Sequence, residues 1–182
     1  MFMHDPAIRT LIVDRYAAVH AAFPTAEYPA YLTVGQPDAP HAVLGFRTAG
    51  AEPLLLERYV ERSIEHVVSA TFGCTVSRDR IAEIGNHASH RPGATIRLWR
   101  EAAAALEGRA DYAVAVLTQP LRAMFARLAL PIIVLAPAAI SAVGSEAAQW
   151  GRYYDADPML CVGDVALCRR RLDTITYGRT RP

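Results

Sequence analysis

Apolar residues recur along the chain at two different spacings, which predict helices and strands in turn. From Asp5 and Pro6, which can begin a helix, apolar positions follow one another at helical spacing as far as Phe23. The stretches 31–34 and 41–47 have strand character, and the turn residues between them, GQPDAP, predict an antiparallel hairpin.

Downstream of the hairpin the pattern predicts helices and strands that alternate at short intervals. The clearest helix spans 95–110, where Thr95 can cap the start and Gly108 ends it. Because such alternation implies parallel crossover units, we expect an α/β fold with a mixed central sheet and helices on both faces. The remaining predicted elements are a largely helical stretch at 52–73, a helix at 120–130 and strands at 80–85, 112–118 and 131–137.

Length and composition fit one domain with one core. The chain has 182 residues, 52% of them hydrophobic, so we expect a single domain over 1–182 with a frayed end at 178–182. The formal net charge of +1 does not predict a nucleic-acid partner. All 19 basic residues are arginine, which we attribute to coding bias rather than to function.

The cysteines and the apolar stretches indicate the cellular compartment of the protein and whether it spans a membrane. Cys74, Cys161 and Cys168 are odd in number and form no C-x-x-C motif, which favours a reducing compartment and a cytoplasmic location. The most apolar stretch, 128–144, is shorter than the ~20 residues of a spanning helix, and prolines interrupt it. We therefore expect no transmembrane segment.

The stretch 82–95, AEIGNHASHRPGAT, carries the densest candidate chemistry. Glu83, His87 and His90 suggest a metal site, but the Gly-Asn pair between them breaks a helix, and no H-x-H or H-E-x-x-H spacing occurs. We therefore expect no metal. Two interpretations remain: an ordinary turn in which Glu83 faces solvent or pairs with an arginine, and a phosphate-binding turn.

The phosphate-binding interpretation depends on the helix that follows this turn. A strand, a loop with Gly93 and a helix that opens at Thr95 present unpaired backbone N–H groups and the positive end of a helix dipole. Arg91 adds a forked donor that suits a pyrophosphate.

Four stretches, in order along the chain, resemble the thermostable hemolysin family of bacterial proteins: EPLLLERYVERSIE, RIAEIGNHAS, RLALP and WGRYYDADPMLCVGDVA. The most specific part of the resemblance is EIGN together with WGRYYD…P…GD. That family resembles the Gcn5-related N-acetyltransferase (GNAT) superfamily and, within it, the acyl-homoserine-lactone synthases. The resemblance implies transfer of an acyl group from acyl-CoA or acyl carrier protein to a small amine or amino acid.

The resemblance also implies roles for individual residues. An amine that attacks a thioester must lose a proton, and Glu83 lies on the strand where the superfamily often places that base. Asn86 and His87 would orient the substrate. Many relatives protonate the leaving thiolate with a tyrosine on the next helix, where this chain has Phe125. Either Tyr153 or its neighbour Tyr154 would then take that role, or no proton donor would be needed.

The donor-binding residues follow from the same resemblance. Such folds contain two central parallel strands that splay apart, and the loop and helix after the first of them hold the phosphates of the donor. The superfamily's loop pattern, [RQ]-x-x-G-x-[GA], is not complete here. We expect the donor-binding set to be Arg91, Gly93, Ala94, Thr95 and Ile96.

Two segments in the C-terminal part of the chain can each be interpreted in two ways. In WGRYYDADP the aromatic residues either pack the segment on the sheet or line a substrate site, in which case Arg152 and Asp155 face the substrate. The cluster at 169–171, three arginines, either docks an acidic carrier protein or forms a solvated helix end.

Two other functions remain open beside acyl transfer. One is a membrane-active hemolysin, although lysis usually needs an amphipathic or spanning apolar segment. The other is an acyltransferase fold that has lost catalysis and acts as a binding protein.

Overall fold

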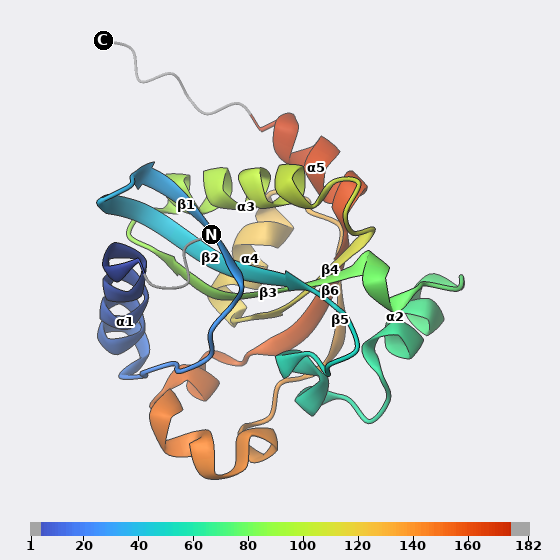
Figure 1. Cartoon of the computed structure of the whole chain (residues 1–182), viewed down its shortest axis with the longest axis horizontal. Coiled ribbons are helices and arrows are strands. Elements are labelled where there is room, and N and C mark those ends of the chain that lie inside the picture. The colour runs from blue at the N-terminus through green and yellow to red at the C-terminus, as the bar shows by residue number, and fades with distance from the viewer. Residues whose placement is uncertain (1–4, 176–182) are drawn as a thin grey trace.

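The computed structural model describes residues 5–175, so the predicted frayed end at 178–182 lies outside the described residues. Six strands form one mixed sheet in the order β1-β2-β3-β4-β6-β5 (Figure 1). Only β3 and β4 pair in parallel; the other neighbours are antiparallel. The strands are β1 (Ala30–Gln36), β2 (Ala39–Thr48), β3 (Ile81–Ser89), β4 (Tyr112–Leu117), β5 (Ile132–Pro137) and β6 (Met159–Asp164).

The predicted fold class and the predicted hairpin, β1 and β2, are confirmed. The pattern gave no expectation of a strand at Met159–Asp164, and this strand separates β4 from β5. Its central residues Leu160, Cys161 and Val162 are buried on both faces, so the strand shows no alternation that would mark it in the sequence.

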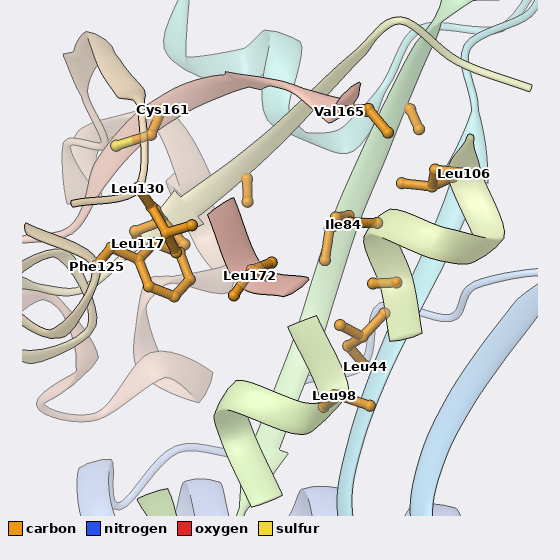
Figure 2. Close-up of a cluster of buried hydrophobic side chains, with 14 of the residues drawn as sticks. Leu44, Ile84, Leu98, Leu106, Leu117, Phe125, Leu130, Cys161, Val165 and Leu172 are labelled. Carbon is orange, nitrogen blue, oxygen red and sulfur yellow. The ribbon is translucent and has the colours of Figure 1, made fainter. Parts of the chain in front are cut away.

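The helices cover both faces of the sheet (Figure 1). On one face α3 (Pro92–Leu106), α4 (Gln119–Arg127) and α5 (Val165–Asp173) enclose the largest core. On the other face lie α1 (Pro6–His20) and α2 (Ile64–Phe72). Figure 2 shows the labelled core side chains of the first face, among them Leu44, Ile84, Leu98, Leu117 and Phe125.

Two predicted helices have other boundaries in the structure. The helix predicted over 52–73 is a short 3-10 turn, η1 (Leu55–Tyr59), followed by α2, because the chain is extended at Val60. Helix α3 starts at Pro92 rather than at Thr95, since proline fits the first helical position and the residue before it is extended.

The two parallel strands separate part-way along their length, as the resemblance implies. Strand β3 pairs with β4 only from Ile81 to Ile84, and it then continues beside β2 to Ser89. At the point of separation Asn86 has a φ of 50°, a left-handed conformation that asparagine tolerates. The resulting gap between β3 and β4 is the place where a ligand can reach the middle of the sheet.

Between β5 and β6 the chain leaves the sheet and passes beneath it as two 3-10 segments (Figure 1, orange). These are η3 (Ile140–Trp150) and η4 (Tyr153–Ala156). Backbone hydrogen bonds tie them to the end of α1: Phe23 N donates to Gln149 O at 2.7 Å and Arg152 N donates to His20 O at 2.6 Å. This segment closes the α1 side of the gap between β3 and β4.

Candidate active site

A central cavity of about 220 Å³ passes through the gap between β3 and β4. On the α1 side its walls come from η1, the 25–28 loop and the 140–156 segment; on the other side they come from α3 and α4. The lining is mainly apolar and aromatic, with a few polar groups, as is usual for a small-molecule site. It includes Tyr28, Leu56, Ile84, His87, Trp99, Leu117 and Tyr153.

A second cavity, of about 430 Å³, opens between α1, the end of β3, the start of α3 and α4. We call it the arginine-lined cavity because Arg15, Arg91 and Arg127 contribute to its wall and no carboxylate does. It shares His87 and Tyr153 with the central cavity, among other residues. The two cavities therefore meet in the gap between the strands.

A third, apolar cavity of about 60 Å³ lies under α3, α4 and α5. It shares Trp99, Ala115 and Leu117 with the central cavity. The indole ring of Trp99 meets the ring of Phe125 edge-on, with centroids 5.0 Å apart, at the boundary between them. An alkyl chain in the central cavity would reach this apolar cavity next.

The carboxylate of Glu83 is fully buried beside the central cavity but does not line it. Oε2 accepts hydrogen bonds from Arg47 Nη2 at 2.9 Å, Arg47 Nε at 3.1 Å and Leu55 N at 2.9 Å. Oε1 accepts one from the hydroxyl of Tyr28 at 2.9 Å. Of the two positions expected for Glu83 in an ordinary turn, facing solvent or pairing with an arginine, the structure shows the pairing.

Tyr28 stands between Glu83 and the cavity, and its position depends on two glycines. Gly45 on β2 and Gly85 on β3 are register partners, and the Tyr28 ring lies against both. A Cβ at Gly45 would be 2.7 Å from ring carbons, and a Cβ at Gly85 would meet the hydroxyl itself. Sequence reasoning missed Tyr28; the signal was the pair of isolated strand glycines, which often mark a close approach.

Tyr153 lies where the central and arginine-lined cavities meet. It is buried, and its ring stacks on Tyr16 with centroids 6.1 Å apart and meets His20 edge-on at 5.2 Å. Burial raises its pKa well above the ordinary value, so the hydroxyl keeps its proton. The neighbouring Tyr154 hydroxyl is 2.7 Å from that of Tyr59, and Tyr154 lines neither cavity.

The sequence profile of the thermostable hemolysin family matches residues 4–168. The chain belongs to this family. No curated protein matches the sequence closely enough to count as a relative.

Solved structures show the same fold for this hemolysin-family chain. The acyl-homoserine-lactone (AHL) synthase LasI superposes with a TM-score of 0.60 at 13% identity, over 97% of this chain and 91% of that chain. TofI, in a ternary complex with an inhibitor and MTA, gives 0.58 at 14%, over 92% and 89%. FeeM, an N-acyl amino acid synthase from uncultured soil microbes, gives 0.56 at 16%, over 91% and 92%. At these identities the likeness shows the fold.

Of the predicted donor-binding residues, the structure brings two to the arginine-lined cavity. Arg91 and Thr95 line it, whereas Ala94 and Ile96 pack against the core and Gly93 is exposed outside the lining. Thr95 lies inside the first turn of α3, where its hydroxyl donates to Arg91 O at 3.3 Å.

Asn86 and His87 occupy the wall of the gap. The Asn86 amide donates to Ala26 O at 2.6 Å, which fixes the loop that carries Tyr28. His87 reaches both cavities, and burial together with the nearby charge of Arg15 lowers its pKa to about 4.

The other charged candidates lie away from the cavities. Arg152 and Asp155 are exposed and line none of the three, although Trp150 and Tyr153 from the same segment line the central one. In the basic cluster, Arg169 pairs with Glu107 at 2.9 Å. Glu107 follows the C-terminal end of α3, whereas the arginine-lined cavity lies at the N-terminal end of the same helix. The length of α3 therefore places the cluster about 20 Å from that cavity.

Within residues 5–175, every helix is too short or too polar to span a membrane. Nor do three or more histidine, cysteine, aspartate or glutamate side chains gather there as a metal site would require.

Proposed function

We propose that the protein is an N-acyltransferase that moves an acyl group from a thioester to the amino group of an amino acid. The observation that carries this proposal is the pair of cavities that meet in the gap between β3 and β4. Two substrates can enter, one through each cavity, and react where the two cavities join. The fold, shared with AHL synthases and an N-acyl amino acid synthase, supports the same reaction class.

The donor enters through the arginine-lined cavity. Its three arginines offer forked donors to a phosphate, and no carboxylate in the lining opposes them. Both acyl-CoA and the phosphopantetheine arm of a carrier protein carry such a phosphate, followed by a long arm that ends in the thioester. The acyl chain then passes through the gap towards Trp99 and the apolar cavity.

The acceptor enters the central cavity. Arg58 and Glu146 form an ion pair of 3.0 Å in its wall, and both are partly exposed. A zwitterionic amino acid presents the complementary charges, a carboxylate for Arg58 and an ammonium group for Glu146. This pair therefore favours an amino acid over a simple amine.

Glu83 acts on the attacking amine through Tyr28. The Tyr28 hydroxyl accepts the proton that the amine loses and passes its own proton to Oε1 of Glu83. Burial and the charge of Glu83 raise the pKa of Tyr28, so the two transfers occur together and no free tyrosinate forms. The amine nitrogen bonds to the thioester carbon, and the sulfur leaves.

Asn86, His87 and Tyr153 complete the site. Asn86 holds the Tyr28 loop in place, and His87 contacts the substrates in the gap. Tyr153, whose ring lies at the junction of the two cavities, passes its hydroxyl proton to the leaving thiolate and takes one back from water as the thiol departs. Glu83 returns the proton of the amine to water, which restores the site. We propose that Arg152 and Asp155 take part only at the entrance, because both are exposed.

Incubation with acyl-CoA or acyl carrier protein and a panel of amino acids, followed by mass spectrometry, tests the proposal. We expect an N-acyl amino acid and one free thiol per product molecule. Tyr28→Phe and Glu83→Gln should each lower turnover by roughly 10²- to 10⁴-fold, the usual contribution of a general base. Tyr112→Phe is the matched control: Tyr112 begins β4, lines neither the central nor the arginine-lined cavity, and its variant should keep wild-type turnover.

Dye release from lipid vesicles, measured in parallel, separates the other functions. Lysis without any acyl donor would favour a membrane-active protein. Donor binding without product or lysis would favour a binding protein.

The three cysteines are unpaired, which is consistent with the cytoplasm, where both kinds of donor occur.

A further inference from the structure

Two residues that line the central cavity each have a buried ring nitrogen without a hydrogen-bond partner. These nitrogens are Nε2 of His87 and Nε1 of Trp99, and no other described side chain has a buried nitrogen or oxygen atom in this state. The two rings are neighbours, with centroids 5.8 Å apart and planes tilted by 40°, and both residues line the central cavity. Buried polar groups in proteins are nearly always paired, so two orphans in one cavity indicate a polar ligand group between them.

The chemistry of the two atoms restricts that group. The indole N–H of Trp99 can only donate a hydrogen bond. His87 has a pKa of about 4 and is therefore a neutral imidazole at pH 7, whose Nε2 can accept one when the proton is on Nδ1. A hydroxyl group satisfies both atoms at once because it accepts from the indole and donates to the imidazole.

The positions of the two residues place this hydroxyl on the acyl chain. His87 lies where the central cavity meets the arginine-lined cavity, and Trp99 lies where it meets the apolar cavity. An acyl chain that runs from the donor cavity to the apolar cavity passes His87 first and Trp99 second. The group between them is then within a few carbons of the thioester.

We propose that this site selects a hydroxylated acyl chain, of the 3-hydroxyacyl class, over a saturated chain of the same length. The inference rests on the proposed acyl transfer and names its donor more closely. The thioester oxygen itself is a weaker candidate for the pair. On the proposed path the thioester would lie in the gap, where β3 beyond Ile84 no longer pairs with β4 and can offer backbone N–H groups to the oxygen. Trp99, in contrast, approaches from α3.

Equilibrium binding of 3-hydroxyacyl-CoA and of saturated acyl-CoA, by calorimetry without an acceptor, tests this selectivity apart from turnover. We expect the wild-type protein to bind the hydroxylated chain about 10-fold more tightly, which corresponds to one or two net hydrogen bonds. Trp99→Phe keeps the ring but removes the N–H, and it should bring the ratio close to one. His87→Leu should do the same.

Trp150→Phe is the matched control, because this second tryptophan also lines the central cavity but its nitrogen is not a buried orphan; the ratio should stay near the wild-type value. Equal affinity of the wild-type protein for both donors would overturn the inference and leave the acyl transfer standing. So would an equal loss of both affinities in Trp99→Phe. Failure to bind either acyl chain, on CoA and on acyl carrier protein alike, would overturn the proposed function and this inference together.

Discussion

The hydroxyl of Tyr28 donates a hydrogen bond of 2.9 Å to Oε1 of Glu83, from a loop 55 residues earlier in the chain. Glu83 is buried and separated from the central cavity, whereas Tyr28 lines it. Arg47 and the backbone of Leu55 occupy the other carboxylate oxygen. A substrate in the cavity can therefore reach the carboxylate only through the tyrosine.

Gly85→Ala should disturb this contact, because the new methyl group would occupy the position of the Tyr28 hydroxyl. We expect a loss of about 1–3 kcal/mol in the free energy of unfolding, from overpacking and the broken buried hydrogen bond. Urea unfolding measures it. Gly50→Ala, with open space around the new methyl group, is the control and should change stability little. Equal stability of the two variants would show that Tyr28 is not held by the glycines.

Replacement of the three cavity arginines Arg15, Arg91 and Arg127 by glutamine should weaken donor binding. We expect the dissociation constant for CoA to rise about 10-fold for each arginine that contacts a phosphate, since hydrogen bonds to charged groups are strong. Calorimetry at two salt concentrations measures the effect, which should shrink as salt rises. Arg62→Gln, exposed and outside the cavity, serves as the control. Unchanged affinity in the triple variant would move the donor elsewhere.

His87 should make the fold less stable as the pH falls from about 6.5 to about 4. Burial and the charge of Arg15 lower its pKa from 6.5 to about 4, so the unfolded chain binds the proton more tightly than the folded protein does. By linkage, the contribution of the neutral His87 to the free energy of unfolding is fully present above pH 6.5. It is lost on acidification, by up to about 3 kcal/mol. The unfolding free energy between pH 7 and 4 measures this slope. His87→Leu should remove this part of it; an unchanged slope would contradict the assignment.

Gly151→Ala should destabilise the protein more than Gly144→Ala. Both glycines have a positive φ, of 46° and 52°, so either alanine strains the backbone by roughly 1–3 kcal/mol. Only at Gly151 would the new methyl group also meet the carbonyl oxygens of His20 and Ala21. Unfolding in guanidinium chloride compares the two. If both lose the same stability, the contact with the end of α1 is not what holds the 140–156 segment.

Local pattern was sufficient for most of the secondary structure and for the fold class. Helical and strand periodicity act over a few residues, so the pattern predicted α1, α3, the β1–β2 hairpin and strands β3, β4 and β5. It did not predict β6, which is buried on both faces and lacks the alternation of a half-exposed strand. The family resemblance, which depends on short motifs, was also evident from the sequence and is confirmed.

The arrangement of the site was decided only by tertiary structure. The sequence singled out Glu83, but nothing near it in the chain indicates that Tyr28 would cover it or that Gly45 and Gly85 would pair beneath that ring. Nothing in the sequence marks Trp99 either, because it has the ordinary spacing of a core residue on its helix. Its side chain lines a cavity only because β3 and β4 separate. Periodicity records which face of an element is buried; which distant side chains meet there depends on strand register and on the packing between layers.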